Sequence, residues 1–191
     1  MADELPTEIY VLPGESHLVS GPAILRTVLG SCVGVTFRIP RLGMAALCHP
    51  MLPAYPGGGR AIPGLAAGRR YVDFTIRDLA RQFDSLGARR EEIEVKLFGG
   101  GDVLVVTNPE SRPTVGRLNC EAALKVLCEE GFEVAASSLG GTCGLNIQFH
   151  TITGEVLLKR LSVMGAANVS GSSRRGNPCA DGRLKEEEEK E

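Results

Sequence analysis

The chain of 191 residues contains no tryptophan, and aromatic residues make up only 5% of it. Proteins that bind single-stranded nucleic acid stack its bases on aromatic side chains, so this composition argues against that class of partner. A formal net charge of −2 argues against the strongly basic surface that nucleic acid or an anionic membrane attracts. No apolar run approaches the roughly 18 residues of a transmembrane helix. We therefore expect neither a nucleic-acid partner nor membrane insertion.

The spacing of ligands that a zinc site requires is also missing. None of the six cysteines forms a Cys-x-x-Cys pair, and the three histidines are scattered at His17, His49 and His150. Zinc ligands lie closer together in sequence, so we expect no metal. Residues 1–6 are acidic and lack the basic and apolar regions of a signal peptide, which predicts a cytoplasmic protein.

The apolar pattern predicts many strands and two helices. Strands are expected at residues 9–12, 23–29, 33–38, 44–47, 93–98, 132–137, 145–150 and 155–161. Helices are expected over 71–86 and 119–130, the second with Asn119 as its N-cap and Gly131 as its stop. The apolar face of the first helix holds Val72, Ile76, Leu79, Phe83 and Leu86. Two helix-then-strand units among many strands predict an α/β layered sandwich of mostly antiparallel strands, with two main helices packed on the sheet.

The composition changes near the C-terminus. Residues 170–176 are rich in serine, glycine and arginine, and residues 185–190 are all glutamate and lysine. Such segments cannot bury apolar area. We expect residues 1–165 to form one domain and residues 166–191 to form a disordered polar and charged tail.

A small flexible loop, Gly30-Ser31-Cys32, precedes a predicted hairpin, and His49 follows it. A turn centred on Pro40-Arg41 would place Cys32 directly opposite His49. Directly opposed residues have Cβ atoms about 4.5–5.5 Å apart and share a face. A shift of the register by a residue or two would still leave both residues at the open end of the hairpin.

A lone cysteine in a β-rich segment is more often a core residue than a catalyst, but three features favour catalysis. Gly30 and Ser31 leave little bulk around the sulfur, so that backbone N–H groups can converge on an oxyanion. His49 is placed to lower the thiol pKa from about 8.5 and to act as general base. Thr27 lies upstream, where it can orient the imidazole. These residues indicate a cysteine hydrolase.

The other motifs have simpler interpretations. Gly99-Gly100-Gly101 lacks the pattern of a phosphate-binding loop, and a strand-like piece follows it where a helix is needed. We expect it to be a tight backbone path near the active site or the core. Cys48, Cys120 and Cys128 are expected to be small buried hydrophobic residues.

The segment Leu29-Gly30-Ser31-Cys32-Val33-Gly34-Val35, with His49 in a His-x-Met-Leu-Pro run, resembles CheD, the chemoreceptor glutamine deamidase family. The resemblance extends from about residue 9 to residue 161, and residues 166–191 lie outside it. Later similar features follow in the same order: Tyr71-Val72-Asp73, residues 96–101, Gly116 with Asn119, Gly140-Gly141 and Thr153-Gly154.

The resemblance implies a protein-glutamine glutaminase that hydrolyses glutamine side chains of methyl-accepting chemotaxis receptors to glutamate and ammonia. It implies Cys32 as nucleophile, His49 as base and Thr27 as the third member, with no metal or organic cofactor. It also implies a CheC-like phosphatase as regulatory partner. One position departs from the pattern, because Leu145 stands where the family usually carries an arginine after the glycine pair.

Two other functions remain open. The first is a non-catalytic binding module that regulates such a phosphatase, with an idle Cys32. The second, which the residues alone allow, is another cysteine-dependent amidase or peptidase.

Overall fold

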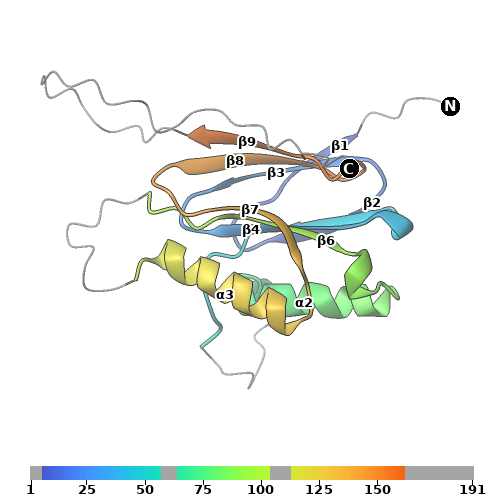
Figure 1. The fold of residues 1–191 in the computed structure, drawn as a ribbon, viewed down its shortest axis with the longest axis horizontal. Coiled ribbons are helices and arrows are strands. Elements are labelled where there is room, and N and C mark those ends of the chain that lie inside the picture. The colour runs from blue at the N-terminus through green and yellow to red at the C-terminus, as the bar shows by residue number, and fades with distance from the viewer. Residues whose placement is uncertain (1–5, 57–63, 104–112, 162–191) are drawn as a thin grey trace, which may run out of the picture.

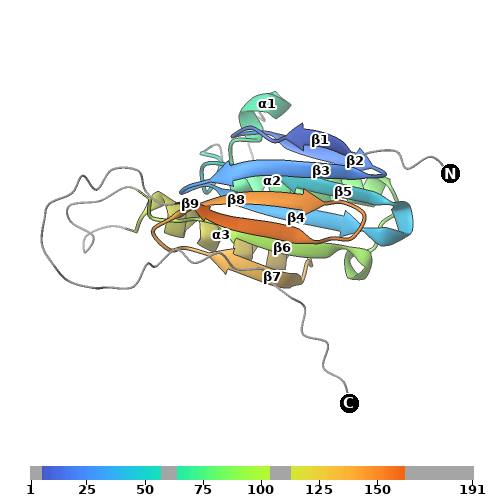
Figure 2. The ribbon, with the colours of Figure 1, turned by 90° about the horizontal axis from the view of Figure 1, so that it is seen from above.

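The computed structural model describes residues 6–56, 64–103 and 113–161. These residues form three layers, which are a four-stranded sheet, a five-stranded sheet, and two main helices on the outer face of the second sheet (Figure 1). Viewed from above, the four-stranded sheet lies over the five-stranded one (Figure 2). The predicted α/β sandwich of mostly antiparallel strands with two packed helices is confirmed. The expected tail at residues 166–191 lies outside the described residues.

The first sheet has the strand order β1-β3-β8-β9 and the second has the order β2-β5-β4-β6-β7. The first sheet contains β1 (Thr7–Tyr10), β3 (Ala23–Leu29), β8 (Gly144–His150) and β9 (Val156–Leu161). The second contains β2 (Ser16–Ser20), β5 (Met44–Cys48), β4 (Val33–Ile39), β6 (Glu94–Gly99) and β7 (Val134–Leu139). The β1–β3 and β6–β7 pairs are parallel, and the other pairs are antiparallel. The helices are α1 (Leu65–Gly68), α2 (Val72–Ser85) and α3 (Val115–Glu129), and the 3-10 turns are η1 (Pro40–Leu42) and η2 (Arg90–Glu92).

The second sheet is apolar on both faces, because it lies in the middle of the three layers. On β4, Val33, Val35 and Phe37 pack in the core beneath the helices. On β5, Ala45 and Leu47 pack in the core between the two sheets. Successive strand residues point to opposite faces, so each middle strand serves both cores.

Helix α2 buries the face that the sequence predicted, with one exception. Val72, Ile76, Leu79 and Phe83 are all buried against the second sheet. Leu86 is 41% exposed, because it follows the last helical residue and is the C-cap.

Helix α3 begins at Val115, one turn before the predicted start. Its N-cap is Thr114, whose hydroxyl accepts a hydrogen bond from the Arg117 N–H at 3.2 Å. The prediction of Asn119 as N-cap is therefore wrong. Threonine is also a good N-cap, and Thr114 lies only one turn and a residue before Asn119 in the sequence. Asn119 instead lies inside the helix and is fully buried.

Two further expectations differ from the structure. Strand β2, which pairs with β5 along the second sheet, was not predicted. Its side chains are only partly buried, so it carries no clear apolar alternation. Cys128 is exposed on α3 and Cys120 is half-buried, whereas Cys48 is buried as expected.

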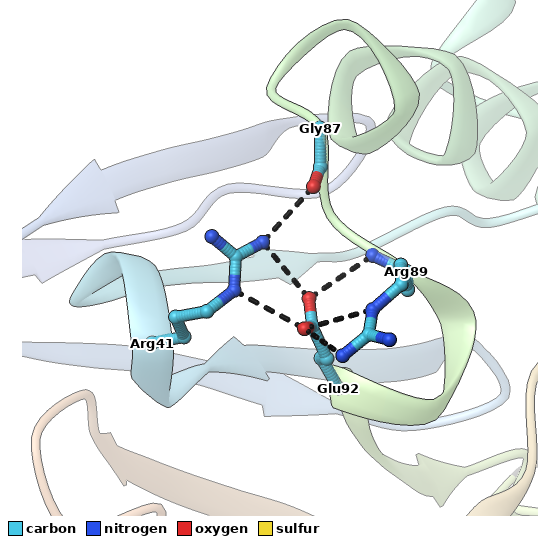
Figure 3. Close-up of polar contacts among 4 residues, drawn as sticks. All are labelled: Arg41, Gly87, Arg89 and Glu92. Carbon is cyan, nitrogen blue, oxygen red and sulfur yellow. Dashed lines mark hydrogen bonds and ion pairs between the residues drawn. The ribbon is translucent and has the colours of Figure 1, made fainter.

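Ion pairs of Glu92 with two arginines hold the closed end of the β4–β5 hairpin. Glu92 accepts hydrogen bonds from the guanidinium groups of both Arg41 and Arg89, and Arg41 also donates to the Gly87 carbonyl at 2.9 Å (Figure 3). These bonds from Arg41 and Arg89 hold the pKa of Glu92 down at about 2. This network joins η1 to η2 at the end of the hairpin that is remote from Cys32 and His49.

Candidate active site

Thr27 and His49 meet between the two sheets. On β3 the buried residues alternate, and Thr27 belongs to the set that faces the second sheet. His49 directly follows β5 and continues the alternation of Ala45 and Leu47 into the same core. The Thr27 Oγ1 atom lies 2.7 Å from His49 Nδ1, and both side chains are buried. One residue from each sheet thus forms the contact.

The hydrogen bonds around Thr27 assign the tautomer of His49. The Thr27 hydroxyl donates its single hydrogen to the Val11 carbonyl at 2.7 Å, so toward His49 it is an acceptor. The imidazole must then carry its proton on Nδ1 and donate it to Thr27, which leaves the lone pair on Nε2. The Nε2 atom is buried and has no hydrogen-bond partner in the described part of the chain. His49 therefore holds an unengaged basic nitrogen.

Cys32 and His49 flank the open end of the hairpin, but they are not directly opposed. Ile39 pairs with Met44 and Val35 with Cys48, so the register differs by two residues from the predicted one. The cause is the turn, in which η1 is followed by Gly43 in the left-handed conformation with φ of 60°.

The two loops still lie side by side. The Val33 N–H donates to the Pro50 carbonyl at 3.4 Å, which brings the residues after Cys32 and His49 together. Cys32 itself is half-buried and packs against the core between the sheets.

The Gly30-Ser31-Cys32 loop is fixed by its backbone carbonyls. The Gly30 carbonyl accepts from the Gly101 N–H at 2.9 Å, and the Cys32 carbonyl accepts from the Gly100 N–H at 2.7 Å. The Ser31 carbonyl accepts from the side-chain amide of Asn119 at 2.8 Å. Neither the Ser31 nor the Cys32 N–H donates to another residue among those described.

The glycine run behind this loop is a tight backbone path, as expected. Gly99 and Gly100 have positive φ values of 98° and 66°. A Cβ at Gly99 would lie only 2.4 Å from the Cys32 carbonyl oxygen, so no other residue fits without moving the loop.

Asn119 is the residue of this site whose place the sequence analysis missed. Its Nδ2 donates to the Ser31 carbonyl at 2.8 Å and to the Met51 carbonyl at 2.9 Å. A signal was present, because Gly116, Asn119, Ala123 and Val126 recur at helical spacing and form the buried face of α3. A polar residue on such a face requires a buried partner.

Burial sets the protonation of the pair. Loss of solvent raises the pKa of the Cys32 thiol, an effect that its own backbone N–H offsets only in part. Burial lowers the pKa of His49 from 6.5 to about 4, against a smaller opposing effect of the Val11 carbonyl. The expectation that His49 lowers the thiol pKa is therefore wrong for the resting site. Both groups are neutral at pH 7, because removal from water penalises each charged form.

Leu145 packs in the core between the two sheets and also lines a hollow beside the Gly140-Gly141 turn. It is 5% exposed and pairs directly with Arg160 across β8 and β9. Arg160 lines a hollow of about 260 Å³ together with the Gly140-Gly141 turn and Thr142. The Gly141 carbonyl accepts from the Asp102 N–H at 2.7 Å, so this hollow adjoins the glycine run behind Cys32.

Within residues 6–56, 64–103 and 113–161, no three side chains of the metal-ligating types gather at one place. No helix of these segments has the length and apolar composition to cross a membrane.

Comparison with known proteins identifies relatives. The family model described as CheD chemotactic sensory transduction matches residues 51–160. The "Probable chemoreceptor glutamine deamidase CheD 2" of Geobacter sulfurreducens is 45% identical over 154 residues, 81% of this chain and 90% of that protein. The "Probable chemoreceptor glutamine deamidase CheD" of Maridesulfovibrio salexigens is 34% identical over 155 residues, 80% of this chain and 91% of that protein. Among solved structures, the Bacillus licheniformis hypothetical protein YfiH aligns with a TM-score of 0.45 and 14% identity, over 67% of this chain and 51% of that one. Because the family model spans more than half of the sequence and a relative is 45% identical over 90% of its own length, this chain belongs to the CheD family.

Proposed function

We propose that this protein is a chemoreceptor glutamine deamidase, an amidohydrolase that converts glutamine side chains of chemotaxis receptors to glutamate and releases ammonia. Its membership of the CheD family and the names of its relatives support the reaction. The observation that carries the mechanism is the hydrogen bond between Thr27 and His49, because it leaves the His49 Nε2 free to accept a proton.

The first chemical step is thioester formation. The Cys32 sulfur attacks the carbon of the glutamine amide while His49 Nε2 takes the thiol proton. The tetrahedral intermediate collapses when the protonated His49 returns that proton to the amide nitrogen. The carbon–nitrogen bond breaks, ammonia leaves, and a thioester joins Cys32 to the substrate.

Hydrolysis completes the cycle. His49 Nε2 removes a proton from water as the water oxygen attacks the thioester. Glutamate and the Cys32 sulfur separate, and His49 returns the proton to that sulfur. Each step needs His49 neutral at its start and cationic at its middle. Thr27 and the Val11 carbonyl stabilise the cationic form at Nδ1.

The oxyanion of each tetrahedral intermediate needs hydrogen-bond donors in place before the reaction begins. The N–H groups of Ser31 and Cys32 are the proposed donors. The Ser31 N–H shares its peptide plane with the Gly30 carbonyl, which is bonded to the Gly101 N–H, and the Cys32 N–H shares its plane with the Ser31 carbonyl, which is bonded to Asn119. These bonds keep the two N–H groups from rotating freely. Gly30 keeps the loop compact, since a Cβ there would lie 3.1 Å from Val103.

Chemotaxis receptors are the proposed protein substrates, and a CheC-like phosphatase remains a proposed regulatory partner. We place the reaction in the cytoplasm. The catalytic domain is proposed to be residues 1–165, with residues 166–191 dispensable for chemistry.

The test is to incubate the full chain with the cytoplasmic fragment of a chemotaxis receptor, then to measure ammonia and the intact mass of the fragment. We expect ammonia release together with the mass increase of an NH₂ group replaced by OH, and neither with Cys32→Ala. Ammonia release by neither protein would favour the non-catalytic binding module. Shorter fragments would indicate a peptidase.

A further inference from the structure

Asn119 connects the two loops that carry the proposed nucleophile and base. Its side chain is fully buried, and its Nδ2 donates to the Ser31 carbonyl at 2.8 Å and to the Met51 carbonyl at 2.9 Å. Ser31 directly precedes Cys32, and Met51 follows His49 by two residues. Asn119 is the one side chain, among the residues that the structure describes, that hydrogen-bonds to both loops.

We propose that Asn119 is a positioning residue that sets the spacing of Cys32 and His49, an inference that rests on the proposed function. The two hydrogens of an amide NH₂ lie in one plane at a fixed angle. Two carbonyls bonded to that one group are therefore held at a fixed separation, and so are the loops that carry them. Holding reacting groups in the correct geometry is a large part of catalysis.

The orientation of the amide is determined by its neighbours. A flipped side chain would place Oδ1 against two carbonyl oxygens, which repel it, so the nitrogen must face Ser31 and Met51. In this orientation Oδ1 is buried with no hydrogen-bond partner in the described part of the chain. An unsatisfied buried oxygen lowers stability, and an apolar residue of similar volume would pack α3 without that loss. Packing alone therefore does not explain an asparagine here.

Helix α3 is placed to deliver this amide. A Cβ on Gly116, one turn earlier, would lie 2.5 Å from the Gly100 carbonyl oxygen, so the helix backbone contacts the glycine run directly. The Gly100 N–H in turn holds the Cys32 carbonyl. Both contacts bring the helix layer against the rear of the nucleophile loop, where Asn119 completes the attachment.

Asn119→Asp removes the donors and keeps the shape. An ionised carboxylate would repel the two carbonyls, whereas a protonated one donates a single hydrogen bond. We expect kcat to fall roughly 10²-fold at pH 7.5, in line with the effect of a small misplacement of reacting groups. KM should change little, because receptor contacts are untouched. The activity of the variant relative to wild type should rise as the pH is lowered and the new carboxyl becomes protonated.

Val126→Ala is the matched control. Val126 lies on the buried face of the same helix and is 3% exposed, but it forms no hydrogen bond to either loop. It should lower the melting temperature and leave kcat close to wild type. Asn119→Ser, which keeps one donor, is the second variant and should retain more activity than Asn119→Asp if both fold, as judged by near-ultraviolet circular dichroism.

The positioning role would be overturned if kcat fell in all three variants only in proportion to the drop in melting temperature. The three variants are Asn119→Asp, Asn119→Ser and Val126→Ala. Failure of the proposed function is seen separately, as a wild-type protein that releases no ammonia. In that case the alkylation rate of Cys32 by iodoacetamide still tests the inference. It should change in Asn119→Asp and stay at the wild-type value in Val126→Ala, and an unchanged rate in both would refute it.

Discussion

The Thr27 hydroxyl oxygen accepts a hydrogen bond from the His49 Nδ1–H, with 2.7 Å between the oxygen and the nitrogen, across the boundary between the two sheets. Each of the two residues comes from a different sheet. The Thr27 hydroxyl donates its hydrogen to the Val11 carbonyl, so toward His49 it can only accept. The contact fixes both the orientation and the tautomer of the imidazole.

Cys32→Ala should abolish deamidation and leave the fold intact, because the sulfur is the proposed site of covalent attachment and is only half-buried. Ammonia release and circular dichroism are the measurements. Cys48→Ala is the control, since Cys48 is fully buried in the core. It should retain turnover and lose on the order of 1 kcal/mol of stability. Normal turnover by Cys32→Ala would rule out its role as nucleophile.

Thr27→Val should reduce kcat at least about tenfold, and by no more than the roughly 10²–10⁴-fold that a general base contributes. Valine keeps the shape of threonine but cannot accept the Nδ1 proton, so the imidazole loses its assigned orientation. Thr27→Ser keeps the hydroxyl and should remain close to wild type. A Thr27→Val enzyme as active as Thr27→Ser would show that the hydrogen bond has no catalytic role.

Alkylation of Cys32 by iodoacetamide should have a pH midpoint above the roughly 8.5 of a free thiol, because burial raises its pKa. The exposed Cys128 is the internal control and should label faster at pH 6.5. His49→Ala should remove most turnover without raising that midpoint. If Cys32 instead labels faster than Cys128 at pH 6.5 and His49→Ala slows it, the resting pair is ionic and the assignment of neutral groups is wrong.

Stability should fall as the pH is lowered from about 6.5 to about 4, in part through His49. In the unfolded chain this imidazole binds a proton below pH 6.5, whereas in the fold its pKa is lowered to about 4. The unfolded state therefore binds more protons in this window and gains relative stability. His49→Gln removes the titration, so its melting temperature should depend less steeply on pH. Parallel pH curves for the two proteins would contradict the burial effect.

Glu92→Gln should lower the melting temperature and leave turnover unchanged. The substitution removes the charge that binds Arg41 and Arg89 at the closed end of the hairpin, far from Cys32. The pKa of Glu92 is lowered to about 2, so its contribution is present above the ordinary pKa of 4.5 and is lost as the pH falls through about 2. The melting temperatures of the variant and wild type should therefore converge in strong acid. A loss of turnover at pH 7 would show that this network also shapes the site.

The sequence was sufficient to expect Thr27 beside the His49 imidazole, and the two side chains are in hydrogen-bond contact at 2.7 Å. It was not sufficient for the register of the hairpin, since one left-handed glycine, Gly43, lengthens the turn and shifts the pairing. A choice between Thr114 and Asn119 as N-cap depends on whether the helix can approach Gly100, which is a tertiary contact. The direction of the Cys32 pKa was missed for a similar reason, because solvent exclusion depends on the assembled layers.

The site draws on all three layers, with Thr27 from the first sheet, His49 from the second and Asn119 from the helix layer. A newly synthesised chain in which one layer has not yet docked has no aligned thiol and imidazole. Such a chain cannot attack the amides of other proteins while it is still folding. Completion of the three-layer fold is therefore a condition of the proposed reaction.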